Sequence, residues 1–285
     1  MQRAILFTVE KQRVLVPVGE PCPFGCRYCY TRGGEVGLAR VDAQEILRKF
    51  RHFADSNTTA FETIQFGYDG DPFARPERGI SMLRQLALLG KHVNFSTKAL
   101  LTYPTLDALS EIQAYMQTMG KTLSALVSLS CWDSAALVEP HTPTPSERIR
   151  TVARLRHYGI PVFIAVRPVL PHIADEEYER IAIEGKRAGS YGFILGPLYA
   201  DDREQFVRWI PPEALAKVPR RRAPVSWSAH APVWSRYEDA TRLQRLITKI
   251  QERRGRVFLS SADAMAAVSS SAEAMAPFSL ERNAG

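Results

Sequence analysis

Long apolar runs are missing from this sequence of 285 residues. No stretch approaches the roughly 20 consecutive apolar residues that a membrane-spanning helix needs. The first 19 residues contain neither a long apolar segment nor a small-residue cleavage site, so no secretory signal is predicted. We therefore expect a cytoplasmic protein that does not enter the membrane.

Cysteine is also scarce, because the chain has four and three of them lie within eight positions. Disulfide scaffolds distribute an even number of cysteines along a short secreted chain. A tight cluster in a long chain indicates metal binding instead. The hydrophobic share of 45% is sufficient for one large core of the size that α/β barrels have.

Acidic residues are outnumbered, and the formal net charge is +7. This excess favours an anionic partner, either nucleic acid, a nucleotide, or a phosphorylated or carboxylated small molecule. A generally basic surface without a specific partner explains it equally well. Residues 217–256 contain eleven Lys or Arg against three acids, with Trp227 and Trp234 among them. Such a segment suits nucleobase stacking near phosphates, and it also suits a basic helix packed through its aliphatic stems.

Short β-rich runs alternate with amphipathic helical runs along most of the chain. Strands are predicted at residues 14–19, 63–67, 92–96, 125–130, 161–166 and 191–195, and helices at 41–54, 76–90, 105–119, 144–159 and 175–189. Asp42 and Thr144 are the predicted N-caps of two helices, and Glu147 completes a capping box with Thr144. Six βα steps predict a parallel sheet with right-handed crossovers, curled into a partial (β/α)6 barrel of the TIM type. An open doubly wound sheet is the alternative.

The βα rhythm stops after about Leu198. The chain is therefore divided into a barrel core, residues 1–198, and a C-terminal substrate-side extension, residues 199–285. In the extension, residues 217–224 (KVPRRRAP) are predicted to be a basic linker, and residues 238–253 are predicted to be a helix. The small and polar residues 269–276 are expected to fray. The predicted fold is thus an α/β partial barrel with a C-terminal helical extension.

The segment CPFGCRYCY places Cys22, Cys26 and Cys29 at Cx3Cx2C spacing, directly after the first predicted strand. Thiolates are the usual ligands of iron–sulfur clusters. Three thiolates can hold three irons of a four-iron cluster and leave the fourth open, as catalytic metal sites require. A zinc site is an alternative, and its fourth ligand would be Cys131 or a histidine. Such a zinc- or iron–sulfur-containing protein would bind nucleic acid without radical chemistry and would not be an enzyme. A closed electron carrier with Cys131 as fourth cluster ligand is a further alternative.

Cx3Cx2C with an aromatic residue before the last cysteine, in the loop after the first strand of a βα barrel, resembles the radical S-adenosylmethionine (SAM) superfamily. The resemblance implies a [4Fe–4S] cluster whose open iron binds the amino and carboxylate groups of SAM. Reductive cleavage of SAM then yields a 5′-deoxyadenosyl radical that abstracts hydrogen from a substrate. The resemblance also implies a reductant such as flavodoxin or ferredoxin, and it places Tyr28 near the adenine edge of SAM.

Polar residues gather at the predicted C-terminal ends of the strands, where sites form in such barrels. Glycine allows close backbone approach, aspartates suit an ammonium group, and lysine or arginine suits a carboxylate. The alternative for each residue is a satisfied polar group at the barrel mouth. The candidate SAM contacts from these strand ends are Gly67, Tyr68, Asp69, Gly70, Asp71, Ser96, Lys98, Ser128, Ser130 and Arg167.

The order of the blocks GYDGDPF, STKA, SLSCWD, EPHTPTPSERI and VRPVLPHI resembles the spore photoproduct lyase-like branch of the superfamily, over residues 14–175. That resemblance implicates Glu139 and Arg167 in the SAM and substrate side. The branch has a hydrogen-donating cysteine in the loop after the second strand, and this chain has none there, so DNA repair is not carried over. Cys131 is the candidate hydrogen donor, and a small buried hydrophobe is its alternative role. The candidate substrate contacts are Tyr199, Asp201 and Arg203.

Overall fold

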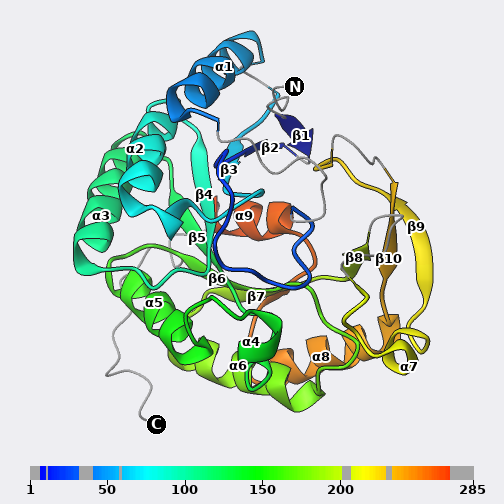
Figure 1. The fold of residues 1–285 in the computed structure, drawn as a ribbon. Helices are drawn as coiled ribbons and strands as arrows, with labels where there is room; N and C mark the ends of the chain where they lie inside the picture. Colours follow the sequence, from blue (N-terminus) through cyan, green and yellow to red (C-terminus); the bar gives the residue numbers. More distant parts are fainter. Residues whose placement is uncertain are drawn as a thin grey trace.

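The structure is a computed structural model that describes residues 7–10, 12–31, 41–57, 60–200, 207–228 and 233–269. A curled sheet forms its centre, and helices lie along the outer side of the sheet (Figure 1). None of the helices in these ranges is long and apolar enough to cross a membrane.

Eight strands form the main sheet, and they follow one another in chain order across it. In spatial order they are β1 (Thr8–Glu10), β2 (Arg13–Val16), β3 (Thr63–Phe66), β4 (His92–Thr97), β5 (Leu123–Ser128), β6 (Val162–Val166), β7 (Gly192–Leu195) and β11 (Val257–Phe258). All neighbours pair in parallel except β1 with β2. The sheet is open between β1 and β11, so the predicted partial barrel is confirmed.

The predicted helices cover the outer face of the sheet (Figure 1). Asp42 accepts hydrogen bonds from two backbone N–H groups of the first turn, and Thr144 and Glu147 form the expected capping box. The longer helices are α1 (Ala43–Ser56), α2 (Pro76–Ala87), α3 (Tyr103–Thr118), α5 (Pro145–His157), α6 (Asp175–Arg187) and α8 (Ala240–Glu252), and the short ones are η1 (Pro72–Ala74), α4 (Ala135–Val138) and α7 (Pro212–Leu215).

The extension contains strands as well as helices. Three strands, β8 (Leu198–Ala200), β9 (Arg220–Pro224) and β10 (Val233–Tyr237), form a separate antiparallel sheet in the order β8-β10-β9. The prediction of a linker at 217–224 is therefore wrong for its second half. As an edge strand, β9 pairs only with β10 and leaves its three arginines exposed, so it carries no apolar alternation that would mark it as a strand. The boundary at residue 198/199 stays a prediction.

A helix that the sequence analysis missed, α9 (Ser261–Ser269), lies inside the curve of the main sheet (Figure 1). Its Ala264 and Met265 pack against Leu126, Phe163 and Ile194, which point inward from β5, β6 and β7. The Ser124 hydroxyl, also on β5, donates to the Met265 sulfur at 3.2 Å. The helix fills one end of the half-barrel and thereby limits the interior cavity to the other end.

Gly185 on α6 is expected to be intolerant of any side chain. A Cβ there would lie 2.2 Å from Ile164 Cδ1 and 2.9 Å from Phe193 Cε1, both in the sheet beneath α6. Gly185→Ala should lower the free energy of unfolding by about 1–3 kcal/mol through overpacking, although alanine favours helix by about 1 kcal/mol. Urea unfolding measures this. Gln251→Ala, at an exposed position of α8, is the control, and equal effects of the two variants would contradict the prediction.

Candidate active site

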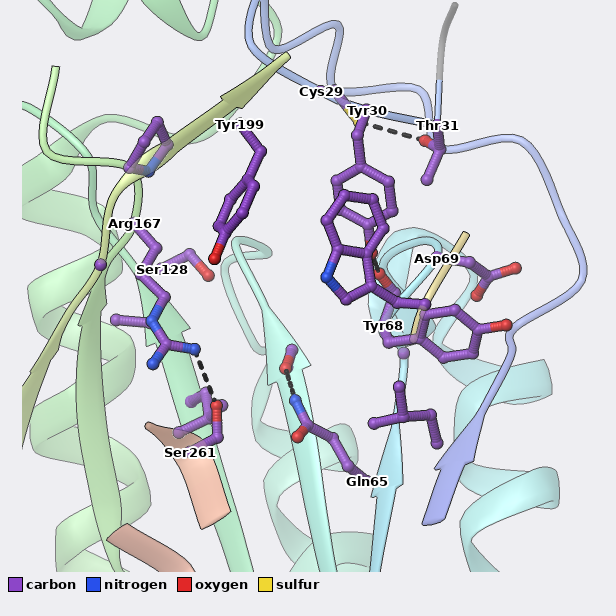
Figure 2. A pocket seen from close by; sticks show the side chains of 18 of the residues that line it. Cys29, Tyr30, Thr31, Gln65, Tyr68, Asp69, Ser128, Arg167, Tyr199 and Ser261 are labelled. Carbon is purple, nitrogen blue, oxygen red and sulfur yellow. Dashed lines mark hydrogen bonds between the residues drawn. The ribbon is translucent and has the colours of Figure 1, made fainter. Parts of the chain in front are cut away.

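A cavity of about 510 Å³ lies between the cysteine loop, the main sheet and the small sheet. Most of the predicted site residues line it. Figure 2 shows several of them facing one another across the cavity. Those in the lining are Cys22, Cys26, Cys29, Tyr28, Gly67, Tyr68, Asp69, Gly70, Asp71, Ser96, Lys98, Ser128, Arg167 and Tyr199. Ser130, Cys131 and Glu139 are not in the lining, and Asp201 and Arg203 fall outside the described residues.

The loop that carries the cysteines is fastened to the segment around α4. Arg27 N donates to Val138 O at 3.0 Å, and His141 N donates to Phe24 O at 3.2 Å. Within the loop, Cys29 N donates to Cys26 O at 3.1 Å. The two bonds to the α4 segment join residues more than 100 positions apart, so the shape of the loop depends on the folded barrel.

The three thiols suit an iron–sulfur cluster. They line one cavity, and burial raises the pKa of Cys26 to about 12, so a thiolate there requires a nearby positive charge such as a bound metal. Among the residues that the structure describes, no three His, Cys, Asp or Glu side chains converge as ligands of a single ion. A cluster does not require such convergence, because each thiolate binds a different iron.

A buried polar network lies behind the loop. The Tyr28 hydroxyl donates to Glu139 Oε1, and the Ser130 hydroxyl hydrogen-bonds to the same phenol oxygen at 2.7 Å. Glu139 is 1% exposed and forms an ion pair of 2.7 Å with Arg148, which is fully buried. Glu139 and Ser130 therefore contact Tyr28 from behind instead of facing the cavity. Ser128 lines the cavity and Ser130 does not, because β5 ends at Ser128 and Ser130 lies beyond the strand.

Arg148 was missed by the sequence analysis, although a signal was present. It occupies the buried face of α5 together with Thr151, Val152 and Leu155, at helical spacing. An arginine on the apolar face of an amphipathic helix must find a buried partner, because an unpaired charge is costly to bury.

Lys98 is the cation beside the cysteines. Its Nζ lies 3.9 Å from Glu139 Oε1 and 5.7 Å from the centre of the Tyr28 ring. Burial alone would lower the pKa of Lys98, but Cys26 and Glu139 outweigh burial and raise it. The ammonium group is therefore charged at the cavity wall.

The two aspartates of the GYDGDPF segment hold the backbone in place. Asp69 accepts from Val18 N at 2.7 Å, which fixes the start of the cysteine loop. Asp71 accepts from Lys98 N at 2.6 Å, from Phe73 N at 2.9 Å and from the Thr97 hydroxyl. Burial raises the pKa of Asp71 against these hydrogen bonds. Both carboxylates therefore stabilise the local backbone through hydrogen bonds. Their contact with the amino group of SAM stays a prediction.

Cys131 is fully buried within the hydrophobic core. Burial raises the pKa of its thiol far above the usual value. This placement matches the alternative role of a small buried hydrophobe, and the role of hydrogen donor stays a prediction.

An aromatic wall made of Tyr30, Tyr199 and Trp227 lines one side of the cavity. Tyr30 and Tyr199 are labelled in Figure 2. The Trp227 ring lies 4.4 Å from Tyr30 and 5.8 Å from Tyr199, centre to centre. The buried Trp234 of β10 supports Trp227 at 4.8 Å. The small sheet therefore brings residues from the extension to the cysteine loop.

A polar group at the opposite end of the cavity includes two residues that the sequence analysis missed, Arg13 and Gln65. Arg13 Nη1 donates to Gln65 Oε1, and Gln65 Nε2 donates to the Ser96 hydroxyl at 3.4 Å. Gln65 is a buried polar residue between the apolar Ile64 and Phe66 of β3, and it faces the interior, which is the signal that could have identified it. Arg167 points into the same region and donates to the Ser261 hydroxyl at 3.0 Å.

The family model described as the Radical SAM superfamily matches residues 16–183, more than half of the chain. The chain belongs to the radical SAM superfamily. This membership indicates an enzyme, and it implies a [4Fe–4S] cluster and SAM.

Curated relatives are uncharacterized proteins of Mycobacterium bovis and Mycobacterium tuberculosis, each 25% identical to this radical SAM protein over 209 residues. The match covers 66% of this chain, which spans 60% of the length of those relatives.

Solved structures share the fold. Spore photoproduct lyase complexed with dinucleoside spore photoproduct has a TM-score of 0.67 at 15% identity, over 91% of this chain and 81% of that one. A mutant of that lyase with bound AdoMet and the same photoproduct gives equal values. Streptococcus suis SuiB bound to S-adenosylmethionine has a TM-score of 0.57 at 15% identity, over 87% of this chain and 50% of that one. The similarity to spore photoproduct lyase confirms the resemblance expected from the sequence.

Proposed function

We propose that this chain is a radical enzyme that holds a [4Fe–4S] cluster on Cys22, Cys26 and Cys29 and uses it to cleave SAM. The observation that supports this is a single cavity lined by the three thiols of a Cx3Cx2C loop, in a chain of this superfamily. When bound, the cluster supplies the electron that splits SAM into methionine and a 5′-deoxyadenosyl radical, which takes hydrogen from a substrate.

The residues beside the cysteines would bind and orient SAM. Lys98 is a charged group within reach of a carboxylate bound next to the cysteines. Gly67 has a φ of 84°, and a Cβ there would lie 2.7 Å from the Pro72 ring, so the turn below the cofactor requires glycine. Ser128 and Ser96 offer hydroxyls to the ribose or the amino acid part.

The walls of the cavity would shield the reaction from water. Trp227 and Tyr199 cover one side, and the first turn of α9 covers another. A carbon radical that reacts with C–H bonds is best produced where the protein shields it from solvent, because side reactions are reduced there. We expect the substrate to be anionic and the electron to come from a reductant such as flavodoxin or ferredoxin.

Anaerobic reconstitution with iron and sulfide, followed by reduction with dithionite in the presence of SAM, tests the proposal. We expect about four irons and four sulfides per chain, and formation of 5′-deoxyadenosine and methionine that depends on both SAM and reductant. Two results would overturn the proposal: a cluster-loaded chain that forms no 5′-deoxyadenosine, or a chain that takes up zinc and no iron.

A further inference from the structure

Arg167 brings a positive charge to the cavity, and no carboxylate of the described residues forms an ion pair with it, although Glu10 and Asp263 are near enough to raise its pKa. Its Nη1 donates to the Ser261 hydroxyl at 3.0 Å and its Nη2 to Leu259 O at 2.9 Å, and both acceptors are neutral. Its Nε is enclosed and has no hydrogen-bond partner in the part of the chain that the structure describes. Arg167 as a whole is partly exposed, but enclosing its Nε without a hydrogen-bond partner is costly. A fold that maintains this arrangement is suited to receive an anion from outside.

Arg13 adds a second guanidinium to this end of the cavity. It reaches the cavity from β2 and is held by Glu10, whose Oε2 lies 3.1 Å from Arg13 Nε. Burial lowers the pKa of Arg167 to about 10, and the nearby charge of Arg13 acts in the same direction. Two carboxylates raise the pKa of Arg167 against these effects, Glu10 and the exposed Asp263, and Glu10 also accepts a hydrogen bond from Ser226. Arg13 and Ser226 bind Glu10, and neither carboxylate forms an ion pair with Arg167 among the described residues, so this positive end of the cavity keeps one guanidinium available to an anion.

This positive end is separate from the cation beside the cysteines. Figure 2 shows the Arg167 side chain running away from Cys29 toward Ser261. Gly196 leaves room for it, because a Cβ there would lie 2.8 Å from Arg167 Nε. Lys98 is the cation near Tyr28 and Glu139, on the cysteine side. The cavity therefore has one cation site that suits the carboxylate of SAM and a second that SAM does not need.

We infer that Arg167 and Arg13 bind the anionic group of the substrate, and that this substrate is a compact small molecule with a carboxylate or phosphate group. The inference rests on the proposed function, because SAM must take the part of the cavity beside the cysteines. A cavity of about 510 Å³ has the size of a small-molecule pocket. Once SAM is bound, the remaining space between Arg167 and the rings of Tyr199 and Trp227 suits a compact molecule that presents a C–H bond toward the cysteines.

Isothermal titration calorimetry of the reconstituted chain with inorganic phosphate and with benzoate tests the inference, in the absence and in the presence of SAM. We expect saturable binding of at least one of these anions at one site per chain, unaffected by SAM. Arg167→Gln should weaken it about tenfold or more, which is the typical loss when one charge-assisted pair is removed. Arg84→Gln, an exposed arginine of α2 that pairs with Glu111, is the matched control and should bind as the wild type does.

Circular dichroism and thermal unfolding of each variant confirm that it is folded, and Arg167→Lys keeps the charge if Arg167→Gln does not fold. Lack of saturable binding of both anions, equal binding by a folded Arg167 variant without charge, or displacement of the anion by SAM would each overturn the inference. The last result would assign Arg167 to the carboxylate of SAM. The titration requires no turnover, so its failure is distinct from a failure to form 5′-deoxyadenosine.

Discussion

Replacing Cys26 with alanine is expected to abolish 5′-deoxyadenosine formation and to remove most of the iron from the reconstituted chain. Cys26 is the most deeply buried of the three loop cysteines and lies between Cys22 and Cys29 in the motif. Loss of its thiolate leaves two cysteines, which cannot hold three irons of a cubane. Iron and sulfide content, the electron paramagnetic resonance signal of the reduced protein and 5′-deoxyadenosine formation measure the effect.

Cys131→Ala is the matched control, because it removes the one remaining cysteine of the chain. Cys131 lies in the hydrophobic core and not in the lining of the cavity, so we expect the iron content of this variant to remain that of the wild type. Loss of the cluster in Cys131→Ala, with folding preserved, would instead place Cys131 among the ligands. Full iron content in Cys26→Ala would exclude the cluster site proposed for the cysteine loop.

Local rules were sufficient to predict the βα order of this protein. Helix caps depend on residues within one helical turn, so they can be predicted from local sequence. This holds for the capping box of Thr144 and Glu147 and for the N-cap Asp42. The strand ends of a parallel barrel gather at one edge, which is why most residues selected from those ends line one cavity.

Contacts between distant parts of the chain were not predictable from local patterns. Tyr28 and Glu139 are 111 positions apart, and no local spacing pairs them. The edge strand β9 is exposed and basic, so its composition resembles that of a linker. The helix α9 is rich in small residues and acquires its position only by packing inside the sheet, against Phe163 and Ile194. In each case tertiary context determines the structure, while the local signal is weak or ambiguous.

The second large effect is expected from Arg148→Met, which should lower the free energy of unfolding by about 3–5 kcal/mol. Arg148 is fully buried and pairs with Glu139 at 2.7 Å, and its Nη1 also donates to Ser128 O at 2.8 Å. Methionine fills similar space but leaves the Glu139 carboxylate buried, with Tyr28 and the more distant Lys98 as its remaining partners among the described residues. For a protein with the usual total stability of about 5–15 kcal/mol, this is a large share. Urea unfolding at matched iron content measures it.

Two further variants separate the effect of charge pairing from that of volume. Arg150 lies two positions after Arg148 on α5, is exposed and pairs with Glu147. Arg150→Met should therefore lower the free energy of unfolding by less than about 1 kcal/mol. The double variant Glu139→Gln, Arg148→Met removes both charges, and we expect it to recover part of the loss, because no buried carboxylate is left uncompensated. If the double variant is less stable than Arg148→Met by the full cost of a second independent substitution, the two side chains are not coupled. In that case the network behind Tyr28 would stabilise the cysteine loop through packing alone.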